Sequence, residues 1–261
     1  GQMSATVTAT IDGNVGIIEL SRPEKLNCLS LEVHECIAAA RAEFEATRDV
    51  RAILIRAQGK HFCTGADLTE VKEKLNDPIG LDQFIGFGMD SLRKLEQSPL
   101  PVIVAVQGLC LAGGIELMLA ADVCFAAATA QFGDQHAQFG LIPGWGGSQR
   151  LTRLMGQRRA LDLMFSARWL KADEAKEAGL VNYIVPDDDL HTAAQEYCQT
   201  MATRSRPGIA EMKRLAREGA DMSIDQQMRL ERDAAVRALP SADVAEGLDA
   251  FEKRRTPDFK Q

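Results

Sequence analysis

Residues 101–121 read PVIVAVQGLCLAGGIELMLAA, an apolar strand that runs into a glycine turn and then opens a helix. The β-branched run 102–106 predicts a buried strand. Gly113 and Gly114 let the backbone approach a ligand, and a helix start presents unpaired N–H groups and the positive end of a dipole. Such a start can hold a developing negative charge. The same glycines would also serve tight strand-to-helix packing, and this stretch alone leaves both interpretations open.

Strands and helices alternate on both sides of this stretch. Ser30 can cap a helix over 31–47, and a second helix is predicted over 81–97. Short apolar runs predict further strands at 16–20, 52–56, 123–127 and 181–185. The alternation indicates an α/β fold.

The chain changes character after Pro186, where only helices are predicted. They are interrupted near Pro207, Gly219 and Pro240. A helical region without strands of its own must bury its apolar faces elsewhere, most simply on another subunit. We therefore divide the chain into a core, 1–200, and a helical C-terminal oligomerisation region, 201–261.

The composition argues against a disordered protein, a nucleic-acid-binding protein and a membrane-spanning protein. With 46% hydrophobic and 26% charged residues in 261, the chain has a globular rather than a disordered composition. A net charge of -7 gives no overall attraction to nucleic acid or to an anionic membrane, and no apolar run reaches the ~18 residues that cross a bilayer. The six scattered cysteines form no CxxC pair or Cys/His cluster, so we predict reduced thiols and no metal site. The expected compartment is the cytoplasm.

A second glycine turn lies at 61–68, HFCTGADL. Gly65 permits an unusual turn, and Asp67 can cap a helix that starts after it, which leaves the Ala66 N–H free to point inward. Two such turns would supply two convergent N–H donors, the physical requirement for stabilising an enolate oxygen.

Glu116 is the only acid within the apolar stretch 101–121, in the first turn of the predicted helix. Burial would raise the pKa of its carboxyl and the helix N-terminus would lower it, so the sequence does not fix its protonation state. Its apolar neighbours argue against a solvated surface acid.

Five segments resemble the signature blocks of the enoyl-CoA hydratase/isomerase (crotonase) family, in family order and spacing. They are SRPEKLNCLS at 21–30, FCTGADL at 62–68, AVQGLCLAGGIELMLAADV at 105–123, QFG at 131–133 with GLIPGWGGSQRL at 140–151, and LKADEAKEAGLVNYIV at 170–185. The resemblance implies a crotonase-type spiral of repeated ββα units with a helical trimerisation region, assembled as a homotrimer or a dimer of trimers.

The resemblance also implies roles for single residues. The family's two oxyanion-hole amides fall on Ala66 and Gly113, and one catalytic glutamate falls on Glu116. The position of the other family glutamate is occupied here by His136. Histidine titrates near neutrality, so His136 either replaces that glutamate as acid/base or only shapes the pocket. Asp134 is a weaker candidate for a displaced carboxylate.

Coenzyme A would enter as part of the substrate, and the resemblance implies no other cofactor. Near the C-terminus, Phe251, Lys253 and Arg254 resemble the patch that completes the coenzyme A site of a neighbouring subunit, although such charges otherwise form a solvated helix face. The other substrate-binding positions are Lys25, as a partner for the phosphates, Leu26, Thr64, by its backbone, and Asp67.

Two further segments surround the expected acyl pocket. Residues 140–147, with Trp145, are interpreted as a structural turn below it rather than a phosphate loop. Residues 70–90 would line it, and Gly80, Gly86 and Gly88 suggest a mobile lid there.

The resemblance implies an acyl-CoA-metabolising enzyme, and the leading hypothesis is a lyase that hydrates a 2-enoyl-CoA thioester. A double-bond isomerase is the next, because a single base can shuttle one proton. Decarboxylation, thioester hydrolysis and ring-forming condensation share the same enolate, so the motifs do not separate them. A catalytically silent acyl-CoA binding protein is the alternative from another class, and the intact Glu116 argues against it.

Overall fold

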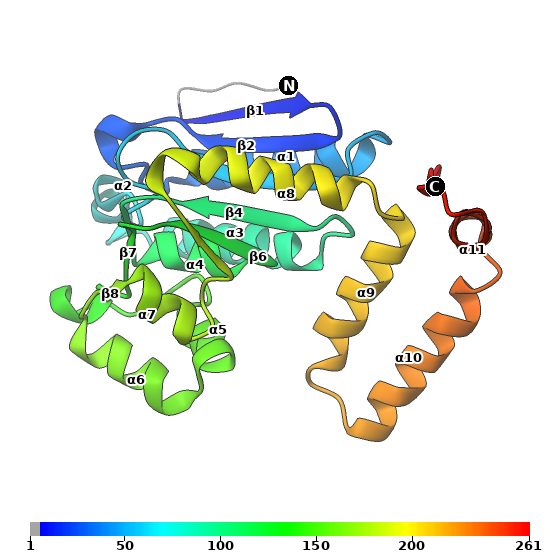
Figure 1. Ribbon diagram of the computed structural model, residues 1–261. Helices are drawn as coiled ribbons and strands as arrows, with labels where there is room; N and C mark the ends of the chain where they lie inside the picture. Colours follow the sequence, from blue (N-terminus) through cyan, green and yellow to red (C-terminus); the bar gives the residue numbers. More distant parts are fainter. Residues whose placement is uncertain (1–5) are drawn as a thin grey trace.

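The computed structural model describes residues 6–261, and the statements that follow concern that part of the chain. Six strands form one sheet in the order β1-β2-β3-β4-β6-β9 (Figure 1). The first pair is antiparallel and the later neighbours are parallel. The strands are β1 (Val7–Asp12), β2 (Val15–Leu20), β3 (Ala52–Ala57), β4 (Val102–Val106), β6 (Val123–Ala127) and β9 (Tyr183–Val185). The five predicted strands are confirmed, the last beginning two residues later than predicted.

A second, small sheet makes the fold a spiral. It contains β5 (Leu109–Leu111), β7 (Gln131–Gly133) and β8 (Leu170–Lys171). The chain passes from β4 in the large sheet to β5 in the small one and into α4 (Gly113–Leu119), then from β6 to β7 and on to α5 (Gly147–Met155). This repetition confirms the predicted crotonase-type spiral of ββα units.

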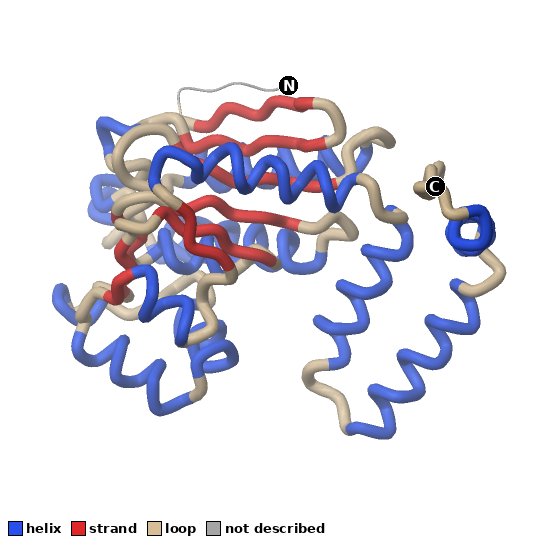
Figure 2. Tube along the Cα trace, viewed as in Figure 1, coloured by secondary structure: helices blue, strands red, loops and turns tan. Residues whose placement is uncertain are grey.

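Helices cover both faces of the large sheet, as Figure 1 and Figure 2 show. On one face α1 (Leu31–Ala46) packs against α3 (Pro78–Gln97), and on the other α8 (Leu190–Ala202) crosses β2, β3, β4 and β6. The predicted cap of α1 is present, because Ser30 Oγ accepts from Val33 N at 3.2 Å. The remaining core elements are η1 (Pro23–Lys25), α2 (Leu68–Lys74), η2 (His136–Phe139), α6 (Gln157–Ser166), α7 (Ala172–Glu177) and η3 (Asp187–Asp189).

Most of the segment 70–90, for which a lid was predicted, is helical. Gly80, Gly86 and Gly88 all lie inside the continuous helix α3, which starts three residues earlier than predicted because Asp77 caps it by accepting from Gly80 N at 3.0 Å. Gly88 is buried where a Cβ would collide with Trp145 Nε1. The glycine therefore serves close packing of α3 on Trp145.

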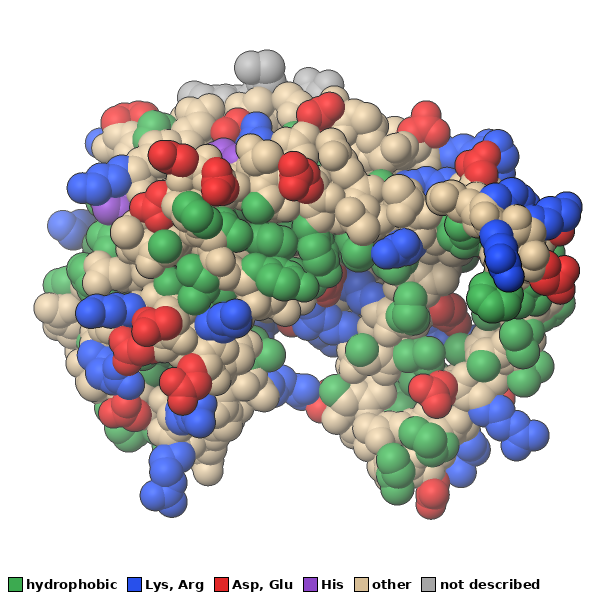
Figure 3. Space-filling view, viewed as in Figure 1, with side chains coloured by type: hydrophobic (Ala, Val, Ile, Leu, Met, Phe, Trp, Pro, Cys, Tyr) green, Lys and Arg blue, Asp and Glu red, His purple; other side chains and the backbone are tan. Residues whose placement is uncertain are grey.

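Three helices form a C-terminal region that stands away from the sheet: α9 (Arg206–Gly219), α10 (Ile224–Ala238) and α11 (Ala242–Lys253) (Figure 1). Its breaks lie where Pro207, Gly219 and Pro240 predict them. Figure 3 shows hydrophobic side chains over α9 and α10 and a hollow between this region and the core. Its exposed apolar residues include Met212, Ile224, Met228, Val236, Leu239 and Leu248.

None of the described helices combines the length and apolar character that a membrane crossing requires.

Candidate active site

Glu116 is held inside the core by the loop that precedes α5. It lies in the first turn of α4 and only 1% of its surface is exposed. Its Oε2 accepts two backbone hydrogen bonds, from Trp145 N at 2.6 Å and from Gly147 N at 2.8 Å. These bonds fix one carboxylate oxygen, whereas Oε1 lies 3.7 Å from His136 Nε2.

The environment of Glu116 raises the pKa of its carboxyl. Burial raises the pKa of the carboxyl and outweighs the Gly147 N–H, His136 and the Trp145 N–H, all of which lower it. A carboxyl with a raised pKa can exchange a proton closer to neutral pH than an ordinary glutamate.

His136 lies between two carboxylates. Its Nδ1 is 3.1 Å from Asp134 Oδ1, and its Nε2 faces Glu116. Burial alone would lower the pKa of the imidazole, but Asp134 and Glu116 together raise it above its ordinary value. Glu116 and His136 therefore shift each other's pKa in opposite directions. Asp134 contacts the opposite ring nitrogen from Glu116, so it supports His136 rather than pairing directly with Glu116.

The ring of Trp145 anchors the loop that holds Glu116. It packs edge-on against His34, at 4.4 Å between ring centroids, and against Phe84, at 5.4 Å. Burial lowers the pKa of His34 to about 4, so this imidazole is neutral at physiological pH. The loop was correctly predicted to be a turn, but its two N–H bonds to Glu116 were missed. The available signal was the GWGG run before a helix, because N–H groups at a helix start lack partners within the helix.

The two glycine turns lie side by side. Cys63 and Cys110 form a parallel bridge, and Leu111 N donates to Cys63 O at 3.0 Å. Gly65 has φ +120°, and a Cβ placed on it would be only 3.2 Å from Ala112 Cβ, directly before Gly113. A side chain at Gly65 would thus be strained and would also crowd the start of α4.

This arrangement leaves two N–H groups without a bond to the protein. Asp67 caps α2 as predicted, accepting from Thr69 N at 3.1 Å, while its own N–H donates to Leu29 O. Within residues 6–261, no acceptor takes the N–H of Ala66 or that of Gly113. The structure therefore brings Ala66 and Gly113 together at the start of the helix that carries Glu116.

The predicted coenzyme A residues fall into two separate groups. In the first, Thr64 N donates to Leu26 O at 3.3 Å, and Lys25 ends η1 directly before Leu26. Asp67 lies 3.4 Å from Arg22, a cation that the sequence interpretation did not include.

The second group lies at the end of α11, far from α2 in Figure 1. Phe251 is 83% exposed, and Arg254 is the C-cap of the helix. Lys253 pairs with Asp249 at 3.1 Å. Within one chain the two groups do not meet.

Comparison with known proteins identifies the family. Residues 10–261 match the profile of the family Enoyl-CoA hydratase/isomerase. A probable enoyl-CoA hydratase of Mycobacterium tuberculosis is 36% identical over 97% of both chains, and a short-chain-enoyl-CoA hydratase of Clostridium acetobutylicum is 33% identical over 95% of both. A 1,2-epoxyphenylacetyl-CoA isomerase of Escherichia coli is 32% identical, over 98% of this chain and 99% of the relative.

A solved structure agrees with these matches. The crystal structure of an enoyl-CoA hydratase from Polaromonas sp. JS666 superposes with a TM-score of 0.94 at 29% identity, covering 97% of this chain and 99% of that one. The spiral fold, the profile match and the full-length relatives together show that the chain is an enzyme of the enoyl-CoA hydratase/isomerase family.

Proposed function

We propose that the protein hydrates a 2-enoyl-CoA thioester. The observation that carries this proposal is the buried Glu116 carboxyl, held by one oxygen and facing His136 with the other, beside the unpaired N–H groups of Ala66 and Gly113. Relatives named enoyl-CoA hydratase match over the whole chain and support it.

The Ala66 and Gly113 N–H groups would form the oxyanion hole. The thioester carbonyl oxygen would accept from both, and negative charge would grow on that oxygen as a nucleophile adds at Cβ. The positive end of the α4 dipole adds to this stabilisation. Because both donors belong to fixed backbone, they would need little rearrangement during the reaction.

Glu116 and His136 would move the protons of one water molecule. Glu116 Oε1 takes a proton as the water oxygen bonds to Cβ. The electron pair of the Cα–Cβ double bond then forms a double bond between Cα and the carbonyl carbon, and the carbonyl electron pair moves onto the enolate oxygen. The enolate then takes a proton at Cα from the Glu116–His136 pair, and its electron pair forms the new C–H bond. One water is consumed and the site returns to its starting state.

The substrate would bring coenzyme A as its handle, and the steps above use no further cofactor. We assign Lys25 to the phosphates, with Leu26, Thr64 and Asp67 beside the nucleotide. We also place the protein in the cytoplasm: the six cysteines are free, as expected in a reducing compartment.

Double-bond isomerisation is the second candidate. One carboxylate, Glu116, lies beside the N–H pair and an imidazole takes the place of the second, which suits transfer of a single proton from one carbon to another. A relative named as an isomerase of a different acyl-CoA is 32% identical.

A spectrophotometric panel of straight, branched and carboxylated enoyl-CoAs tests these assignments. Hydration of a 2-enoyl-CoA removes the absorbance of the conjugated thioester, whereas isomerisation of a 3-enoyl-CoA creates it. We expect at least one 2-enoyl-CoA to be hydrated. Binding of the whole panel without turnover would instead identify an acyl-CoA binding protein and contradict the proposal.

We further propose a homotrimer, or a dimer of trimers, built through residues 201–261. The exposed apolar surface of α9 and α10 supports this, since a monomer would leave it in water. In such an assembly Phe251, Lys253 and Arg254 would complete the coenzyme A site of a neighbouring subunit. Because these residues lie far from α2 within one chain, they can share a site with Lys25 and Thr64 only across two subunits.

Deleting Met201–Gln261 should therefore yield a monomeric or aggregating protein without activity. The deletion removes α9, α10 and α11 and uncovers the core surface that contacts α9. Size-exclusion chromatography with light scattering, run beside the full-length chain, measures the outcome. A stable truncated monomer with full activity would contradict it.

A further inference from the structure

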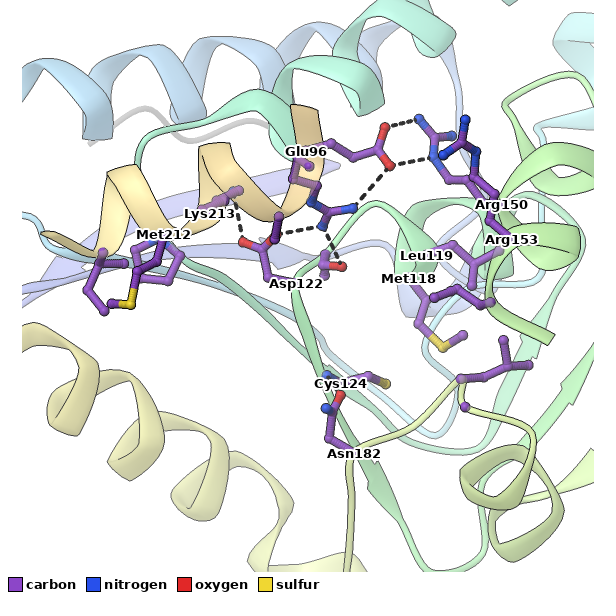
Figure 4. A pocket seen from close by; sticks show the side chains of 18 residues that line it. Glu96, Met118, Leu119, Asp122, Cys124, Arg150, Arg153, Asn182, Met212 and Lys213 are labelled. Carbon is purple, nitrogen blue, oxygen red and sulfur yellow. Dashed lines mark hydrogen bonds and ion pairs between the residues drawn. The ribbon is translucent and has the colours of Figure 1, made fainter. Parts of the chain in front are cut away.

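A cavity of about 620 Å³ lies between the core and α9, and an ion network lines it (Figure 4). The network joins elements that are far apart in sequence. Glu96 comes from α3, Arg150 from α5 and Asp122 from the turn before β6, while α9 supplies Lys213 and Arg217. Apolar side chains such as Met118 and Leu119 of α4 complete the wall.

Arg150 forms a bidentate ion pair with Glu96 through two hydrogen bonds. Arg150 Nε lies 3.0 Å from Glu96 Oε2, and Nη2 lies 2.6 Å from Oε1. Glu96 is only 6% exposed, and the Arg150 side chain 12%. A two-point guanidinium–carboxylate pair in such a place fixes the orientation of the guanidinium as well as its position.

The fixed guanidinium reaches the loop that holds Glu116. Its remaining nitrogen, Nη1, donates to Trp145 O at 2.7 Å. The N–H of the same residue donates to Glu116 Oε2 at 2.6 Å. A continuous series of hydrogen bonds thus runs from Glu96 through Arg150 and Trp145 to Glu116.

The C-terminal region contacts the same network. Arg217 of α9 lies 3.5 Å from Glu96 and also bonds Asp122, while Lys213 lies 2.8 Å from Asp122. Glu96 is therefore shared by two cations from the core, Arg150 and Arg93 at 3.3 Å, and one from the C-terminal region.

We propose that Arg150 is a positioning residue. Its bond to Trp145 O holds the loop in place, and the N–H groups of that loop orient the Glu116 carboxylate. Glu96 in turn links Arg150, and with it the loop, to α9. The inference rests on the proposed role of Glu116. Arg150 itself contacts neither Glu116 nor any reacting atom. A loop displaced by about 1 Å can cost on the order of 100-fold in rate, because the catalytic group no longer meets the substrate in line.

Arg150→Lys tests the inference. Lysine keeps the positive charge beside Glu96 but carries one ammonium on a flexible stem, so it cannot bond Glu96 twice and Trp145 O at once. We expect kcat to fall by about 10- to 100-fold while KM for the enoyl-CoA stays within about 2-fold. The Trp145 and Gly147 N–H bonds lower the pKa of Glu116, so weakening them should move the acid limb of the kcat/KM profile to higher pH.

Arg153→Lys is the matched control. Arg153 lies one turn further along α5 and pairs with Asp221 at 2.6 Å, just beyond α9, so it too joins this helix to the C-terminal region. Its side chain is 58% exposed, and no bond from it to Trp145 is found in residues 6–261. This variant should keep the wild-type kcat and pH profile.

Three outcomes decide the matter. A wild-type kcat and acid limb in Arg150→Lys overturns the inference, as does an equal change in Arg153→Lys. If Arg150→Lys does not fold, Glu96→Gln takes its place: the amide keeps one acceptor for Arg150, and an unshifted acid limb there overturns the inference as well. Glu116→Gln, assayed in parallel, distinguishes failure of the proposed function from failure of the inference about Arg150. Full activity in Glu116→Gln would refute the proposed function itself.

Discussion

Glu116→Gln should abolish enoyl-CoA turnover and leave acyl-CoA binding nearly intact. The amide fills the same volume and its oxygen can still accept from Trp145 N and Gly147 N, so the loop should keep its place. The amide cannot take up a proton, however. Loss of the acid/base group should cost at least about 1,000-fold in kcat.

Steady-state kinetics gives kcat, and calorimetric titration with a saturated acyl-CoA gives the dissociation constant. Glu32→Gln is a matched control, because Glu32 occupies the first turn of α1 as Glu116 does that of α4, but is exposed. The control should behave as wild type. Wild-type turnover in Glu116→Gln would remove this residue from the mechanism.

His136→Ala should depress hydration by about 100-fold, the usual effect of losing a general acid/base. His136 lowers the pKa of Glu116, so its removal should raise that pKa further and move the acid limb of the kcat/KM profile to higher pH. His136→Glu should retain or raise activity on a simple enoyl-CoA, by restoring two carboxylates at the site.

Comparing the two His136 variants separates hydratase from isomerase chemistry. If His136 only shapes the pocket, the alanine variant changes acyl preference or KM and leaves kcat untouched, and that result would leave Glu116 as the sole acid/base. His191→Ala, on α8 across the large sheet, is the control and should have no effect.

Much of this site could be predicted from sequence because its parts are local. Ser30 and Asp67 cap helices that begin directly after them, and 52–56 and 102–106 stand out as short apolar runs rich in β-branched residues. Glu116 stood out as one acid in an apolar run, and its burial follows from those neighbours.

The parts that could not be predicted depend on contacts distant in sequence. Trp145 and Gly147 bond a glutamate about 30 residues away, and Arg150 meets Glu96 across 54 residues. The GWGG run before α5 indicates N–H groups that need acceptors, but it does not say which distant acceptor they meet. The strands of the small sheet have only two or three residues, too few to show a period of two.

The raised pKa of His136 also required the structure. Burial lowers the pKa of His136 and the two carboxylates raise it, so the direction of the net shift depends on how close the carboxylates lie to the imidazole. From sequence, Asp134 was a rival to His136; in the structure it contacts His136 Nδ1 and supports it.

The two unpaired N–H groups belong to the main chain, and this affects how the protein tolerates mutation. Almost any residue at position 66 still supplies an N–H, and among the standard residues only proline removes it. Point mutations can therefore disturb this pair by moving it but rarely by deleting it. Side chains around the acyl group can therefore be exchanged while this pair of N–H donors persists.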